Sequence, residues 1–225
     1  MPDARIRVLL VDDHAMVRRG MRDFLGLHDD IEIVGEAADG LEAVERAVEL
    51  RPDIVLMDLM MPNLDGIEAT ARIKSAMPEV EVVALTSFIE EARVVAAIEA
   101  GASGFLLKDA EADELATAIR SAAAGEVHLD PAVAGIVARR MRDRGRTAGP
   151  GSPDSADGIA ALTARERDVL SRVARGLPNR QIAEDLGITE RTARTHVSNI
   201  LAKLGLASRT QAALLAVQHG LDRDT

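Results

Sequence analysis

The sequence predicts two domains of different class: an α/β domain built on a five-stranded, parallel, doubly wound sheet, and after it a small all-α domain of four helices. Two observations lead to this prediction. Over about the first 125 residues, five short apolar runs alternate with five helical patterns, as in a series of βαβ units with right-handed crossovers. Beyond a stretch rich in Gly, Pro, Ser and Asp, the pattern becomes purely helical. A chain of 225 residues is long enough for both domains.

Each expected strand of the first domain, residues 1–125, is a short apolar run that stops at a polar or charged side chain. The runs cover residues 6–11, 31–34, 54–57, 80–85 and 104–107. Such runs are typical of strands buried on both faces, although Arg7, Glu32 and Glu81 interrupt three of them. Helical patterns follow at about 14–27, 40–50, 67–76, 90–100 and 111–124. A capping box formed by Asp39 and Glu42 opens the second of these helices.

Residues 126–158 are expected to be a linker that contains one helix, at about 131–144. The segment 145–158, GRTAGPGSPDSADG, has almost nothing to bury, so we predict that it is mobile. The second domain, residues 159–225, then shows four helical patterns. A capping box of Thr163 and Glu166 opens the first, which contains Val169, Leu170 and Val173, and the others cover about 180–186, 190–204 and 209–219. A short second helix and a tight turn at Gly187 before the third helix outline a helix-turn-helix unit.

Composition limits the class of protein. The net charge of −10 conceals an asymmetry, because residues 1–130 carry 12 Lys and Arg against 27 Asp and Glu, while residues 159–225 carry 10 against 7. An acidic first part and a basic last part suggest two tasks, the second of them involving nucleic acid. The absence of cysteine excludes disulfides and a thiolate zinc site. No apolar run approaches the roughly 18 residues of a membrane span, and the N-terminus is unlike a signal peptide, so we expect a cytoplasmic protein without membrane contacts.

A set of polar residues lies at the carboxyl ends of four expected strands: Asp12, Asp13, Asp58, Thr86 and Lys108. Doubly wound topology brings these strand ends together at one rim of the sheet, where such folds bind ligands. Three carboxylates there favour binding of a hard cation. Mg²⁺ takes oxygen ligands and is commonly bound by carboxylates and a phosphate group together. The set therefore indicates phosphoryl transfer to a carboxylate. Taken alone, Asp58 is equally compatible with a helix cap. For His14, which follows the acidic pair, we expect packing at a helix N-terminus rather than a metal role.

A second set lies on one side of the helix expected at 190–204: Arg191, Arg194, Thr195, Ser198 and Asn199. An apolar stripe occupies the other side, and it includes Val197 and Ile200. Side chains of these polar types donate to phosphates and base edges of DNA. On polarity alone, an ordinary solvated helix face is the favoured interpretation. Arg180 and Lys203 are further candidate DNA contacts.

The segments LLVDDH, MDLMMPNLDG, ALTS and GASGFLLKD resemble the receiver domain of two-component response regulators over about residues 5–125. The resemblance implies a flavodoxin-like fold with Asp58 as phospho-acceptor, charged by the phosphohistidine of a sensor histidine kinase. It implies a Mg²⁺ site formed by Asp12, Asp13, Asp58 and the backbone carbonyl of Met60. Lys108 matches the lysine that contacts the phosphoryl group, and Thr86 and Phe105 match the switch pair. Phe105 departs from the frequent Tyr, so no hydroxyl is available there.

The segments LTARERDVL, PNRQIAEDLGITERTARTHVSNILAKLG and SRTQAA resemble the LuxR-type (NarL/FixJ) DNA-binding domain over about residues 160–220. The resemblance makes 190–204 the recognition helix. Two departures stand out: Pro178 replaces the usual Ser or Thr, and Ala193-Arg194 replaces the common Val-Lys. Arg194 keeps the charge but adds bidentate geometry, so its base preference can differ from that of relatives.

Together these features predict a transcriptional response regulator rather than an enzyme with turnover on an external substrate. Phosphorylation of Asp58 is expected to change the receiver surface, to favour a homodimer and to control sequence-specific binding to double-stranded DNA. Three alternatives remain: a regulator that binds DNA without phosphorylation, a phosphotransferase that works through an aspartyl-phosphate, and a LuxR-type regulator that senses a small molecule. The last would need a ligand-binding first domain, which the acidic rim does not resemble.

Overall fold

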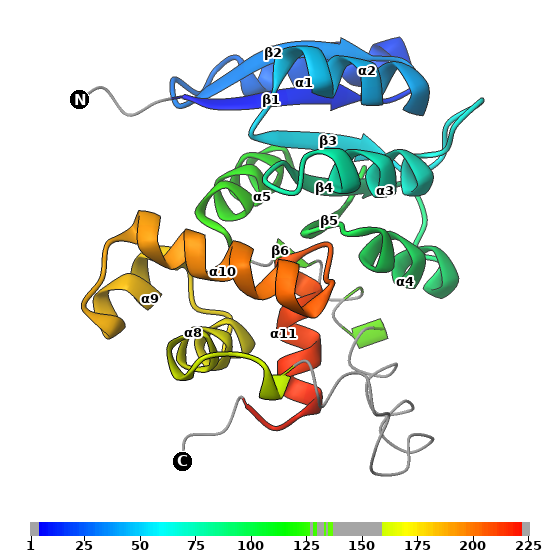
Figure 1. Cartoon of the computed structure of the whole chain (residues 1–225). Coiled ribbons are helices and arrows are strands. Elements are labelled where there is room, and N and C mark those ends of the chain that lie inside the picture. The colour runs from blue at the N-terminus through cyan, green and yellow to red at the C-terminus, as the bar shows by residue number, and fades with distance from the viewer. Residues whose placement is uncertain (1–4, 127, 130–132, 134, 137–158, 222–225) are drawn as a thin grey trace.

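The computed structural model describes residues 5–126, 128–129, 133, 135–136 and 159–221 (Figure 1). The first domain is a parallel sheet with helices on both faces, as the alternating pattern predicts. Its strands are β1 (Ile6–Val11), β2 (Ile31–Ala37), β3 (Ile54–Asp58), β4 (Glu81–Thr86), β5 (Gly104–Leu107) and β6 (His128–Leu129). They lie in the order β2-β1-β3-β4-β5-β6, and every neighbouring pair is parallel. The two-residue β6 was not predicted, because its residues fall in the expected linker.

Five helices connect the strands: α1 (Ala15–Leu25), α2 (Gly40–Leu50), α3 (Gly66–Ala76), α4 (Glu91–Ala100) and α5 (Ala112–Ala124). Their apolar sides divide the core into two layers. Helices α1 and α5 pack on one face of the sheet, around Leu10 and Leu56. Helices α2 and α3 cover the opposite face around Val55, and α4 continues this layer over Phe105. Burial on both faces explains why the central strand β3 is apolar from Ile54 to Met57, whereas the edge strand β2 is less buried and carries Glu32 and Glu36.

The C-terminal domain has four helices: α8 (Ala164–Ala174), α9 (Asn179–Leu186), α10 (Glu190–Leu204) and α11 (Arg209–Gln218). A core that includes Leu170, Ile182, Val197 and Ile200 holds them together. The local signals act as predicted, since Thr163 and Glu166 form a complete capping box at the start of α8. Thr189 and Ser208 cap α10 and α11 through their hydroxyls. Glycines with positive φ, Gly187 and Gly205, end α9 and α10.

The two domains lie in contact. Helices α10 and α11 pack beside the α4–β5–β6 end of the first domain (Figure 1). Of the linker helix expected at about 131–144, only residues 133, 135 and 136 are described, and they are helical; the rest of that helix and the segment 145–158 lie outside the described residues. Val133 and Ile136 are buried against α4 and Phe105.

Within the described residues, no single helix is long and apolar enough to cross a membrane. By length and composition alone, α10 and most of α11 meet that criterion only as a pair bent by 71°.

Candidate functional site

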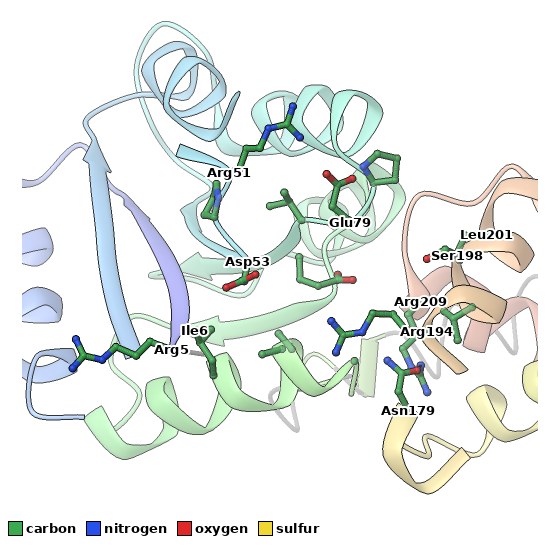
Figure 2. A pocket seen from close by; sticks show the side chains of 18 residues that line it. Arg5, Ile6, Arg51, Asp53, Glu79, Asn179, Arg194, Ser198, Leu201 and Arg209 are labelled. Atoms are coloured by element: carbon green, nitrogen blue, oxygen red, sulfur yellow. The ribbon is translucent and has the colours of Figure 1, made fainter. Parts of the chain in front are cut away.

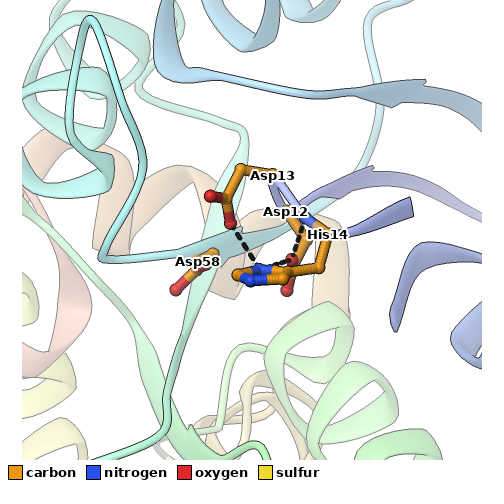
Figure 3. Close-up of side chains that lie close together, drawn as sticks. All are labelled: Asp12, Asp13, His14 and Asp58. Atoms are coloured by element: carbon orange, nitrogen blue, oxygen red, sulfur yellow. Dashed lines mark hydrogen bonds and ion pairs between the residues drawn. The ribbon is translucent and has the colours of Figure 1, made fainter. Parts of the chain in front are cut away.

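The acidic residues meet at the carboxyl rim of the sheet (Figure 3). Asp58 is the last residue of β3 and is 2% exposed, and Asp12, directly after β1, is fully buried. Ligand atoms of Asp12, Asp13, His14 and Asp58 all lie within 4.8 Å of one another. The close approach follows from topology, because β1 and β3 are adjacent parallel strands and end at the same edge.

Lys108 joins this rim from the loop that follows β5. Its Nζ donates to Asp58 Oδ2 at 2.6 Å and forms an ion pair with Asp12 Oδ2, also at 2.6 Å. Burial raises the pKa of the Asp58 carboxyl, and the hydrogen bonds from Lys108 and from the Met60 amide oppose this rise only in part. For Lys108 burial lowers the pKa, but the contacts with Asp12 and Asp58 outweigh it, so the pKa is raised overall. The lysine therefore stays charged and offsets two buried carboxylates.

His14 differs from its expected role. Its side chain is 69% exposed, so it does not pack at the start of α1, where it also makes no side-chain cap. Its Nδ1 lies 2.7 Å from Asp13 Oδ1 and 3.3 Å from Asp12 Oδ1. The ring thus stands among the acidic residues, and its position next to Asp12 and Asp13 in the chain was the available signal.

The rim fits a hard divalent cation by the chemistry of its donors. Carboxylate oxygens of Asp12, Asp13 and Asp58 converge there, and oxygen is the ligand that Mg²⁺ prefers. Among the described residues, Asp12 Oδ2 and Asp13 Oδ1 are buried without a well-directed hydrogen bond, which leaves acceptor capacity for a cation. Asn63, in the following loop, adopts φ 64°, so the loop after Asp58 turns sharply beside these donors.

Thr86 and Phe105, the expected switch pair, occupy neighbouring strands. Thr86 ends β4 and is buried, and its Oγ1 donates to the Phe88 carbonyl at 3.0 Å, in the loop before α4. Phe105 in β5 is buried in a cluster with Ala84 and α4 residues. Any turn of the Thr86 hydroxyl toward the rim would break its bond to Phe88 and so alter the segment that leads into α4.

The polar residues expected on the recognition helix lie on the exposed side of α10. Arg191, Arg194, Thr195, Ser198 and Asn199 are all exposed. Arg194 lies 3.6 Å from Glu190 in an ion pair, and the exposed Arg180 on α9 pairs with Glu184 at 3.2 Å. Such exposed pairs are weak, so both arginines remain available to another anion.

Part of this side of α10 faces the first domain. A cleft of about 610 Å³ separates α10 from the amino ends of β1, β3 and β4 (Figure 2). Arg194 and Ser198 line it from α10, while Asp53, Glu79 and Glu81 line it from the sheet domain. A DNA duplex, whose major groove alone is about 12 Å wide, does not fit into a cleft of about 610 Å³. In this arrangement a duplex could contact Arg194 and Ser198 only if the domains separated.

Lys203, a candidate DNA contact, has a partner within its own domain. Its Nζ lies 2.8 Å from Glu166, the acidic member of the capping box on α8. The bond to Lys203 and the bonds from Thr163 lower the pKa of the Glu166 carboxyl to about 2. Lys203 and Glu166 are 37 positions apart in the chain, so no local sequence pattern predicts their ion pair.

We expect Glu166→Gln to destabilise the C-terminal domain at neutral pH and to reduce its pH dependence in acid. A carboxyl whose folded pKa is lowered contributes stability above its ordinary value of 4.5, and this contribution is lost as pH falls toward about 2. The urea midpoint of wild type, followed by far-UV circular dichroism, should therefore approach that of the variant across this range. Glu45→Gln, an exposed change on α2, is the control. A constant difference between wild type and Glu166→Gln from pH 7 to 2 would contradict the prediction.

Comparison with known proteins agrees with this two-part architecture. Residues 8–120 match the response regulator receiver domain, and residues 160–216 match the bacterial regulatory proteins of the luxR family. The transcriptional regulatory protein LiaR of Bacillus subtilis is 48% identical over 216 residues, which are 96% of this chain and 99% of LiaR. The response regulator VraR of Staphylococcus aureus is 44% identical, over 96% of this chain and 98% of VraR.

Solved structures give the same result. The response regulator ChrA of a heme-sensing two-component system is 38% identical, with a TM-score of 0.52, and the match covers 97% of this chain and 99% of ChrA. A LuxR-family response regulator from Aurantimonas sp. is 37% identical, with a TM-score of 0.58, over 61% of this chain and 98% of that one. The chain belongs to the luxR family of response regulators. It is a transcriptional regulator with a receiver domain and a LuxR-type DNA-binding domain, as its motifs predicted.

Proposed function

We propose that Asp58 accepts a phosphoryl group from the phosphohistidine of a sensor kinase, with Mg²⁺ beside it, and that this group controls access of the recognition helix to DNA. One observation carries the proposal: a buried carboxylate stands at a rim shared with two further acids and receives a 2.6 Å hydrogen bond from Lys108. The combination suits a nucleophilic carboxylate whose charge is balanced before and after reaction.

In the proposed reaction, a carboxylate oxygen of Asp58 attacks phosphorus and the bond from phosphorus to the histidine nitrogen breaks. Lys108 turns from its two carboxylate partners toward the added phosphoryl oxygens. Asp12, Asp13, Asp58 and the Met60 carbonyl would hold Mg²⁺, which supplies positive charge to the transferring group. Each chain accepts one phosphoryl group and releases it slowly by hydrolysis, so the step is self-modification and not turnover of an external substrate.

The response to the phosphoryl group begins at Thr86. We propose that its hydroxyl leaves the Phe88 carbonyl for a phosphoryl oxygen, and that Phe105 repacks behind it. The segment between β4 and α4 then changes, and α4 with it. The resulting change in surface favours separation of the domains and formation of a homodimer. Two recognition helices would then reach half-sites about one helical turn apart, or a multiple of that spacing.

On the DNA side, we propose that Arg191, Arg194, Thr195, Ser198 and Asn199 contact base edges and phosphates, since they share the exposed side of α10. Arg180 is proposed as a phosphate contact from α9. Lys203 remains a candidate only at the edge of the interface, because Glu166 already neutralises its charge. Both the kinase encounter and DNA binding place the protein in the cytoplasm.

The test is DNA affinity with and without phosphorylation. A duplex selected by the phosphorylated protein from a random library serves as the probe, and acetyl phosphate with Mg²⁺ serves as phosphodonor. We expect affinity to rise on phosphorylation, because Arg194 and Ser198 are withdrawn in the closed arrangement. Equal affinity in both states would favour a phosphorylation-independent regulator. Repeated hydrolysis of a phosphomonoester would favour the phosphotransferase alternative.

Arg194→Ala provides the control on the DNA side. It should accept the phosphoryl group as wild type does, since Arg194 is remote from the rim, yet bind the selected duplex less tightly by roughly 1–3 kcal/mol if the residue contacts a base. An unchanged affinity would remove Arg194 from the interface.

A further inference from the structure

The end of α4 is capped by a side chain from the other domain. The last turn of any helix leaves carbonyl groups without a partner in the helix, and these groups carry its negative dipole end. In α4 the chain then turns at Gly101, with φ 110°. Gln211 of α11 reaches this turn across the domain boundary. Its Nε2 donates to the Ile98 carbonyl at 2.9 Å and to the Glu99 carbonyl at 2.8 Å.

The same carboxamide also serves the start of its own helix. Gln211 is the third residue of α11, after the N-cap Ser208. Its Oε1 accepts from the Ala207 backbone amide at 2.8 Å, and the backbone amide of Gln211 donates to Ser208 Oγ at 3.3 Å. The oxygen of the side chain is therefore used within the DNA-binding domain, while its NH₂ group is used across the boundary. A substitution that exchanges only the NH₂ group separates the two roles.

Neighbouring contacts fix this junction. Thr210 Oγ1 donates to the Ser103 carbonyl at 3.2 Å, in a buried position just before β5. A Cβ on Gly101 would stand 3.0 Å from Ala207 Cβ, so the two backbones approach as closely as a glycine allows. Leu214, one turn after Thr210, packs on the cluster that contains Phe105. Helix α11 thus rests on α4 and on the β5 strand that carries the expected switch residue.

We propose that the Gln211 carboxamide is the latch that holds the DNA-binding domain against the receiver. A shift of α4 carries the Ile98 and Glu99 carbonyls away from Gln211, and the loss of both hydrogen bonds releases α11 together with α10. The proposal rests on the proposed function in naming phosphorylation as the cause of that shift. The latch itself is a property of the closed arrangement and can be tested without phosphate.

The test is Gln211→Glu in the full-length, unphosphorylated protein. The carboxylate still accepts from the Ala207 amide, and Ser208 Oγ still accepts from the backbone amide of residue 211, so α11 keeps its start. It cannot donate to the α4 carbonyls and is repelled by their negative dipole end. We expect affinity for a random-sequence duplex of about three helical turns to rise at least about fivefold, since at least one net hydrogen bond of the closed form is lost. The radius of gyration from X-ray scattering should increase.

The control is Gln181→Glu, which makes the same change of charge at an exposed position on α9. Added negative charge weakens DNA binding, so this variant should bind equally or less well and keep the wild-type radius of gyration. The rise in DNA affinity expected for Gln211→Glu is therefore opposite to the effect of its added negative charge. Thermal unfolding followed by circular dichroism verifies that the DNA-binding domain remains folded.

The outcomes distinguish the latch from the proposed function. A folded Gln211→Glu protein with wild-type radius of gyration and no gain in affinity overturns the latch, whatever phosphorylation does. If the proposed function fails, the DNA affinity of wild type would be the same with and without the phosphodonor. Gln211→Glu would still have a larger radius of gyration than wild type. If both hold, the phosphodonor raises the DNA affinity of wild type but not that of Gln211→Glu, because the latch is already open in the variant.

Discussion

Asp58→Asn is expected to abolish the phosphoryl adduct that wild type forms with acetyl phosphate and Mg²⁺, and intact-mass measurement will show it. The carboxamide has no anionic oxygen to attack phosphorus and contributes no charge to a metal site. It also has nearly the volume of the carboxylate, so the buried end of β3 stays filled. Because burial raises the pKa of Asp58, removal of the charge removes a desolvation cost, and the variant should remain folded. The DNA affinity of the variant should then be the same with and without the phosphodonor.

Asp29→Asn is the matched control, since Asp29 is an exposed aspartate in the turn before β2. It should acquire one phosphoryl group per chain, as wild type does. An undiminished adduct in Asp58→Asn would place the phospho-acceptor on another residue. An adduct that is absent from wild type would remove the phosphorylation mechanism altogether, while the luxR-family assignment would stand on the sequence matches.

The strands and helices of the receiver domain each have a local sequence pattern, and this is why the sequence predicts that domain well. Each strand of a doubly wound sheet is a short apolar run, and its first polar residue marks the carboxyl end. Asp12, Asp58 and Lys108 were placed at one rim from this rule alone, and the structure brings both carboxylates to 2.6 Å from the Lys108 ammonium. The rule fails for β6, because a two-residue strand is too short to carry any periodicity.

Contacts between distant segments are outside the reach of such patterns. Lys203 has the charge and position of a DNA contact, and only the fold shows that Glu166 holds it. In the sequence, Gln211 looks like an ordinary third residue of a capped helix. Nothing near it indicates that its side chain contacts α4, whose Ile98 lies 113 residues earlier in the chain. The closed arrangement is stabilised by contacts of this kind between distant segments, and such contacts involve residues for which the motifs predict no role.

A second large effect is expected for Gly66→Ala, which should lower the free energy of unfolding by about 3 kcal/mol, near the upper end of the usual cost of overpacking. Gly66 is the first residue of α3, and its amide donates to the Leu59 carbonyl at 3.3 Å. A Cβ there would overlap the Asp58 carbonyl oxygen and stand 2.9 Å from Leu59 Cα. Both obstacles are backbone atoms at the end of β3 and directly after it, beside the proposed phospho-acceptor Asp58, so they cannot move aside as a side chain does. Urea unfolding followed by circular dichroism measures the change.

Gly20→Ala is the informative partner for this variant. Gly20 lies inside α1, and beyond the adjacent backbone of its own helix no atom lies within 4 Å of its added Cβ, so alanine there should stabilise the protein by about 0.5–1 kcal/mol through its higher helix propensity. The opposite signs of two identical substitutions would show that backbone approach at Gly66, and not loss of glycine as such, determines the effect. Because the strain at Gly66 falls on the Asp58 carbonyl, Gly66→Ala should also accept the phosphoryl group more slowly than Gly20→Ala. Equal stability and equal phosphorylation of the two variants would mean that α3 can withdraw from the end of β3, and the loop between them would then not fix the geometry of the acidic rim.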